Sequence, residues 1–151
     1  TGNWRIGAEG LGGEGGTTGR FMAELRQRVF GMRGVTFTGR GGVATTDPLP
    51  QSAFRLGGLK TVRGFDYGTY QGQAFWSAQG DWTPLKGKVR PVLFVDVGQA
   101  GTVGGIFEQK PLVGAGAGVS FFNGIVRFDL SVPLAGPAQG LRFDIQFGAP
   151  R

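Results

Sequence analysis

The sequence predicts an all-β protein, an antiparallel up-and-down transmembrane β-barrel with about eight strands in this chain. Three observations support this fold class. Apolar and polar residues alternate with a period of two along most of the chain. Glycine, with 31 of 151 residues, interrupts the alternating segments without the fixed period of collagen. The charges of each segment fall on one face, as they do in strands that separate lipid from a polar interior.

The length of the chain is enough for one domain and hardly for two, so we expect residues 1–151 to form a single barrel domain. The chain begins at Thr1 rather than Met, and we therefore expect it to be processed, excised or truncated. No apolar run approaches the ~20 residues that a membrane-spanning helix needs, whereas a barrel strand needs ~9–11 residues.

Eight segments show the alternation expected of strands. In RFMAELRQRVF, residues 20–30, apolar residues alternate with arginine and glutamate, and GIVRFDLSVPL and LRFDIQF repeat the pattern further on. None of the segments places apolar residues at i, i+3, i+4 and i+7, as an amphipathic helix would. The candidate strands lie near residues 3–11, 19–30, 34–44, 73–84, 90–99, 112–122, 124–133 and 141–148.

The connections between these segments are of two kinds. Short connections are expected at 31–33, 85–89 and 122–124. Longer, glycine-rich connections are expected at 12–18, 45–72, 100–111 and 134–140. Asn123-Gly124 predicts a two-residue hairpin turn. Short turns at one end and long loops at the other are typical of an outer-membrane barrel, with the short turns in the periplasm.

The apolar face of the candidate strands carries almost no ionisable side chain. In lipid this is required, because Lys or Arg at the middle of the bilayer costs about 2–4 kcal/mol. Aromatic residues gather at the strand ends next to the short connections, where an interfacial girdle belongs. They are Trp4, Phe30, Trp82, Phe122 and Phe147. A soluble β-sandwich or ligand-binding barrel with an unusual surface remains the alternative.

The composition argues against several classes of function. The chain has no cysteine and no histidine, so we expect no disulfide, no metal site and no cofactor. No nucleophile lies beside a base, and enzymatic activity is not expected. Asp129 and Asp144 alternate with Arg127 and Arg142 as a ladder of charges. The net charge of +6 is spread along the chain, so nucleic acid is not the expected partner.

The longest connection contains LGGLKTVRGFDYG, residues 56–68, and is too apolar for a solvated coil. A connection beyond ~15 residues is usually functional or disordered, and we expect this one to pack inside the barrel. Together with FVDVG at residues 94–98, it resembles the C-terminal transmembrane barrel region of the BamA-like superfamily. That superfamily comprises outer-membrane insertases, TamA-like assembly factors and two-partner-secretion transporters. The three candidate strands before the loop and five after it resemble the C-terminal half of a sixteen-stranded barrel.

The resemblance implies that the loop folds back into the lumen and that its arginine contacts the aspartate of the strand motif. Carried over to this chain, the loop motif is Val62, Arg63, Gly64 and Phe65, and the strand motif is Phe94, Asp96 and Gly98. The family usually has a glutamate shortly before a proline on the strand after the loop. This chain offers Asp81 instead, one residue closer to Pro84, and we carry it as a second partner for Arg63. No POTRA-type domain is expected in residues 1–151.

The parity of the strands supports an inward position for the predicted partner. Phe94, Asp96 and Gly98 share one face of their strand. A carboxylate inside a barrel needs a cationic partner or water, and the planar fork of arginine can bind it with two hydrogen bonds. On the next strand Gly114, Gly116 and Gly118 share the inward face. They either leave a groove for another backbone or ease the bending of the sheet.

We therefore expect an outer-membrane β-barrel involved in membrane-protein insertion or polypeptide translocation, with the lumen loop bracing the wall. The alternative is a passive anchor or small pore without translocation activity. The expected partners are outer-membrane lipid, substrate polypeptides, and either a second copy of the chain or the missing half of the barrel. An eight-stranded barrel is just wide enough for its own side chains, so we expect that eight strands are not the whole barrel. The sequence names no substrate.

Overall fold

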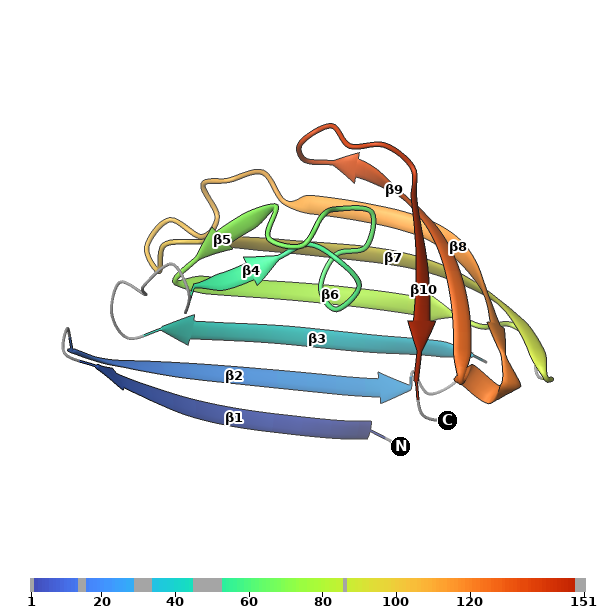
Figure 1. Ribbon diagram of the computed structural model, residues 1–151, viewed down its shortest axis with the longest axis horizontal. Coiled ribbons are helices and arrows are strands. Elements are labelled where there is room, and N and C mark those ends of the chain that lie inside the picture. The colour runs from blue at the N-terminus through green and yellow to red at the C-terminus, as the bar shows by residue number, and fades with distance from the viewer. Residues whose placement is uncertain (1, 14–15, 29–33, 45–52, 86, 149–151) are drawn as a thin grey trace.

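The computed structural model describes residues 2–13, 16–28, 34–44, 53–85 and 87–148, and it is a single curved antiparallel sheet of eight strands with a small two-stranded ribbon beside it (Figure 1). The strand order is β1-β2-β3-β6-β7-β8-β9-β10, so neighbours in sequence are neighbours in the sheet apart from the ribbon β4-β5. The sheet contains β1 (Gly2–Gly13), β2 (Gly16–Arg28), β3 (Val35–Ala44), β6 (Ala74–Trp82), β7 (Val89–Gly101), β8 (Leu112–Phe121), β9 (Val126–Ala135) and β10 (Arg142–Phe147). The predicted up-and-down antiparallel arrangement is confirmed.

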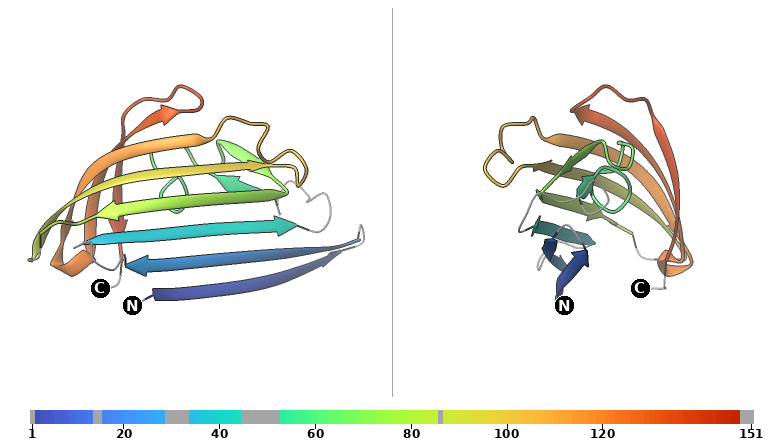
Figure 2. Two further views of the ribbon diagram at one scale, coloured as in Figure 1. Left: turned by 180° about the vertical axis from the view of Figure 1, so that it is seen from behind. Right: turned by 60° about the vertical axis from the view of Figure 1, so that its left-hand side comes forward.

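The sheet is open. Its order ends at β1 on one side and at β10 on the other, and these two strands do not pair with each other in the described part of the chain. Figure 2 shows the resulting trough, with the loop that contains β4 (Phe54–Leu56) and β5 (Tyr70–Gly72) lying on its concave side. The shape is that of half a barrel, and it agrees with the expectation that eight strands do not close around this loop.

Three local predictions were wrong. The expected glycine-rich loop at 12–18 is mostly strand, since β1 and β2 stay paired as far as Gly13 and Gly16. A ladder of main-chain hydrogen bonds does not need side chains, so glycine can extend it. The long connection at 45–72, in which no strand was expected, contains the ribbon β4-β5.

The third error concerns the turn before β9. Asn123 and Gly124 do not form a two-residue turn, because Phe121 pairs with Val126 and leaves four residues between the strands. A 3-10 helix, η1 (Phe122–Gly124), makes this connection. Phe122 adopts a positive φ of 51°, which is uncommon for a residue with a side chain.

The alternation predicted from sequence separates the two faces of the sheet. Large apolar side chains on the convex face are exposed, whereas polar side chains on the concave face are largely buried. The exposed set on the strands includes Ile6, Phe21, Leu25, Phe37, Leu93, Val95, Leu130, Phe143 and Ile145. Trp4, Trp82, Phe122 and Phe147 of the expected aromatic girdle are also exposed. Phe30 lies outside the described residues.

The apolar core lies on the concave side of the sheet, between the sheet and the long loop. It consists of Ala44, Phe54, Leu56, Val62, Phe65, Phe75, Ala100 and Leu112. The loop is thus packed against the wall as expected, with one exception among its described apolar side chains. Tyr67 is 71% exposed, and its ring lies 5.8 Å from the guanidinium of Arg55. Within the described residues, no helix is long and apolar enough to cross a membrane.

Candidate functional site

The loop at residues 57–69, here called the lumen loop, folds tightly because glycines occupy its turns. Gly57, Gly58 and Gly64 have φ values of 114°, 82° and 93°, in the region that residues with side chains rarely adopt. The amide of Gly58 donates to the carbonyl of Phe65 over 2.9 Å and closes the loop. The hydroxyl of Thr61 accepts from the amide of Gly57 and donates to its carbonyl, both at 2.9 Å. These bonds hold the tip of the loop in one conformation.

Arg63 binds Asp96 through a planar, two-pronged contact. Its Nε donates to Oδ2 and its Nη2 to Oδ1, each over 2.6 Å. The main-chain amide of Arg63 also donates to Oδ2 over 2.9 Å. Arg63 is 3% exposed and Asp96 is fully buried. The contact expected between the loop motif and the strand motif is therefore present.

Arg63 contacts two further carboxylates. Its Nη1 lies 2.9 Å from Oδ1 of Asp81 and 3.9 Å from Oδ2 of Asp129. Arg127 lies on the other side of these two groups, 2.9 Å from Asp81 and 2.7 Å from Asp129. These five residues form what we call the lumen cluster, in which two guanidinium groups meet three carboxylates. Asp81 is a partner of Arg63, as expected, whereas Asp129 and Arg127 were not predicted to take part.

Phe94 supports the guanidinium of Arg63 from one side. The ring centroid lies 3.8 Å from Cζ of Arg63, within the range of a cation–π contact. Burial by itself would lower the pKa of Arg63, but the hydrogen bonds and negative charges of Asp96 and Asp81 outweigh burial and raise this pKa. Arg63 therefore remains cationic at neutral pH.

The three inward glycines of β8 do not leave an open groove. A Cβ atom at Gly114 would lie 1.9 Å from the carbonyl oxygen of Arg63, so this glycine admits the loop backbone. A Cβ atom at Gly116 would lie 2.4 Å from the ring of Phe94, and one at Gly118 would lie 2.0 Å from the carboxylate of Asp129. Close approach thus accounts for all three glycines, and a different group fills each space.

Two other motif glycines also make room for neighbouring atoms. A Cβ atom at Gly64 would lie 3.0 Å from the carbonyl of Val132 on β9. A Cβ atom at Gly98 would lie 2.7 Å from the carbonyl oxygen of Trp76. Val62 and Phe65, which flank Arg63 and Gly64 in the loop motif, are fully buried in the apolar core. The motif residues thus combine one buried charge with two apolar anchors.

Two weaker attachments hold the lumen loop on either side of its buried motif. Arg40 on β3 donates to the carbonyl oxygen of Lys60, and it also binds Glu24 over 3.0 Å. Arg142 on β10 binds Asp66, and its Nε lies 3.0 Å from Asp144. The strand alternation places Arg142 and Asp144 in one ladder of charges, but it could not show that Arg142 reaches the loop. Arg142 and Asp144, two residues apart on β10, form the ion pair expected from their spacing.

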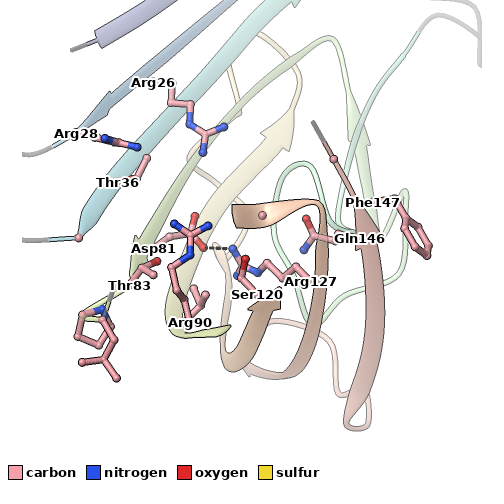
Figure 3. A pocket seen from close by; sticks show the side chains of 16 residues that line it. Arg26, Arg28, Thr36, Asp81, Thr83, Arg90, Ser120, Arg127, Gln146 and Phe147 are labelled. Carbon is pink, nitrogen blue, oxygen red and sulfur yellow. Dashed lines mark hydrogen bonds and ion pairs between the residues drawn. The ribbon is translucent and has the colours of Figure 1, made fainter. Parts of the chain in front are cut away.

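A cavity of about 620 Å³ lies beside the lumen cluster at the end of the trough that carries the short turns (Figure 3). Its lining is mainly polar and basic and includes Arg26, Arg28, Thr36, Asp81, Thr83, Arg90, Ser120, Arg127 and Gln146. In the described part of the chain, no group of three His, Cys, Asp or Glu side chains is arranged to hold a metal ion. The lumen cluster and the cavity are suited to holding the lumen loop and to binding polar groups. The carboxylates of the cluster are neutralised by arginine.

Comparison with known protein families gives one match. Residues 27–121 match the model of the family described as haemolysin secretion/activation protein ShlB/FhaC/HecB. The matched segment is well over half of the chain and contains the loop motif, the strand motif, Asp81 and the three glycines of β8. None of the curated proteins matches the chain.

Proposed function

The chain belongs to the haemolysin secretion/activation protein family ShlB/FhaC/HecB, a family of outer-membrane secretion transporters, and from that premise we propose that it forms part of the wall of a pore that translocates polypeptide. In this proposal the lumen loop braces the wall and sets the space through which polypeptide passes. Membrane-protein insertion, the other activity of the wider superfamily, is not what this family is named for.

One observation carries the proposal. Arg63 is buried on the concave face with its guanidinium bound to Asp96 and Asp81. Burying charges is costly unless each is paired and hydrogen-bonded, and removing one partner leaves the others uncompensated. A loop attached in this way has one favoured position in the lumen. This fixed position supports a lumen loop that lies in the path of the transported polypeptide, rather than a solvated connection outside the lumen.

The exposed apolar face supports a location in the outer membrane, with lipid as the first partner. The open edges at β1 and β10 support a larger barrel, in which further strands come from a second copy of the chain or from the other half of the barrel. An unpaired edge exposes main-chain donors and acceptors, which cannot be left unsatisfied in lipid. The transported polypeptide is the second partner.

The passive anchor is the second candidate function. It is consistent with the same apolar face and the same open sheet, but it gives the lumen loop no role beyond packing. The two candidates differ in whether the wild-type protein exports polypeptide. The role of the lumen loop is tested by a variant that folds and inserts normally while holding its loop less tightly.

Arg63→Lys is such a variant, because lysine keeps the charge but lacks the planar fork. The full-length protein would be produced in a bacterium with an outer membrane, together with the polypeptide that it exports. We expect Arg63→Lys to insert at the wild-type level, judged by heat-modifiable gel mobility, and to release less polypeptide into the medium. Lys88→Gln, at an exposed lysine before β7, serves as the control and should secrete normally. Normal secretion by Arg63→Lys would remove the role given to the lumen loop, and a wild-type protein that exports nothing would refute the proposal and favour the passive anchor.

A further inference from the structure

The cavity at the short-turn end of the trough has an excess of positive charge. Four arginines line it, namely Arg26, Arg28, Arg90 and Arg127, and one carboxylate, that of Asp81. Arg127 is already paired with Asp81 and Asp129 in the lumen cluster, so Arg28 and Arg90 supply the excess. Asp81 is already bound by Arg63 and Arg127, at 2.9 Å each. We call this cavity the arginine vestibule. Figure 3 shows the side chains of Arg26, Arg90 and Arg127 directed into the same space.

Arg90 is the most informative of these residues. It begins the inward face of β7, and its Nε atom is buried without a hydrogen-bond partner in the described part of the chain. Its neighbour across the ladder is Ser120, which brings a hydroxyl rather than a carboxylate. A buried donor without a partner is costly, so the Nε of Arg90 is available to an acceptor that enters the cavity.

Arg28 extends the positive lining to the other side of the vestibule. It lies at the end of β2, its side chain is exposed, and no ion pair joins it to another described residue. A concave surface lined mainly by one sign of charge concentrates ions of the opposite sign. The vestibule therefore favours an anionic acceptor over a neutral one.

We propose that the arginine vestibule binds acidic side chains of the translocated polypeptide as it enters the lumen, an inference that rests on the proposed function. The vestibule lies on the concave face, away from the apolar face that meets lipid. Thr36, Thr83 and Ser120 supply further polar contacts, which suit a hydrated, extended chain. A guanidinium can hold a carboxylate with two parallel hydrogen bonds. Exposed arginines such as Arg28 bind weakly enough to release the chain, as conduction through a pore requires.

The test uses the purified full-length protein in a neutral detergent and two labelled peptides. One is a short Gly-Ser peptide that carries several glutamates, and the other has glutamine in their place. By fluorescence anisotropy, we expect the glutamate peptide to bind more tightly and to lose affinity as salt screens the charges. Arg28→Gln combined with Arg90→Gln should raise the dissociation constant of the glutamate peptide about tenfold. Arg28→Gln alone, at an exposed side chain, should raise it less.

The matched control removes two positive charges outside the vestibule. Lys88→Gln combined with Lys110→Gln changes two exposed lysines that do not line the cavity, and it should leave the dissociation constant unchanged. Equal binding of the two peptides, or an equal loss in this control, would overturn the proposal. So would a double arginine variant that folds, by heat-modifiable mobility, and binds like the wild type.

Two competition experiments distinguish a carboxylate of a polypeptide from a small anion or a lipid headgroup. Inorganic phosphate and glycerol phosphate should not displace the glutamate peptide when added at the same concentration as the peptide. Displacement at that concentration would assign the site to a small anion or a lipid headgroup and overturn its assignment to polypeptide. A protein that secretes normally but shows no dependence on Arg28 and Arg90 would remove this inference and leave the proposed function in place.

Discussion

Arg63 and Arg40 both attach the lumen loop to the wall of the sheet, but their surroundings differ. Arg63 belongs to the loop, is 3% exposed and binds carboxylates on β6, β7 and β9. Arg40 belongs to the wall, and its side chain is 23% exposed. It reaches the loop through the main-chain carbonyl of Lys60, and it shares its charge with Glu24.

The difference shows why one arginine is part of a recognisable motif and the other is not. The partners of Arg63 are buried charges, which must be present in the right places or they destabilise the fold. The partner of Arg40 on the loop is a carbonyl, which any residue supplies. Gln79 also holds this part of the loop, next to Lys60, since its Nε2 donates to the carbonyl of Leu59 over 3.2 Å. The second attachment is therefore less dependent on any single side chain.

The largest effect is expected from Arg63→Ala. It leaves three carboxylates facing Arg127 as the remaining cation of the lumen cluster, and it should lower the free energy of unfolding by about 3–5 kcal/mol. Urea unfolding of the full-length protein in lipid vesicles, followed by tryptophan fluorescence, measures this. Arg55→Ala is the control, because this exposed arginine of β4 contacts a ring at 5.8 Å and its cation–π contact is worth about 0.5–1 kcal/mol. Similar losses of unfolding free energy in the two variants would contradict the special role assigned to Arg63.

A smaller effect is expected from Gly114→Ala. The new methyl group would overlap the carbonyl oxygen of Arg63, which lies 1.9 Å from the Cβ position, so the loop or β8 must move. Such overpacking costs about 1–3 kcal/mol. Gly80→Ala is the control on β6, two strands away, where the nearest atom would lie at an ordinary 3.7 Å. A Gly114→Ala variant as stable as Gly80→Ala would mean that the loop does not rest on β8.

The pairing of Arg63 with Asp96 can be isolated by a double-mutant cycle of Arg63→Ala and Asp96→Ala. Residues in direct contact show coupling energies of about 0.5–3 kcal/mol. The double variant should therefore lose less stability than the sum of the single variants, because neither charge is left without the other. Thermal melting in detergent gives the same comparison independently of urea. Strictly additive losses would contradict the contact.

The smallest effect is expected from Arg40→Ala. Its ion pair with Glu24 is partly exposed, and exposed pairs contribute about 0–1 kcal/mol. Raising the salt concentration should reduce the difference between this variant and the wild type, since solvent-accessible charges are screened. The same urea measurement at low and high salt tests this. A loss as large as that of Arg63→Ala would show that the loop depends on both arginines equally.

Much of the fold could be predicted because a strand has a strict period of two. The positions of all eight sheet strands followed from alternation, to within a few residues at their ends. The errors fell where side chains do not decide the backbone. Glycines extended the β1-β2 ladder because main-chain bonds suffice, and the connection after β8 took four residues although Asn123-Gly124 resembles a tight turn.

The candidate site was predicted in part, for a related reason. The sequence by itself determined that Asp96, Asp129 and Arg127 face the lumen, and the two motifs indicated that Arg63 meets Asp96. Only the tertiary structure decided that Asp129 and Arg127 complete the lumen cluster and that Gly114 receives the backbone of Arg63. Alternation fixes the face of the sheet on which a side chain lies. Its distance from a loop that crosses the trough depends on register, curvature and the path of the loop, which arise when all the strands are paired.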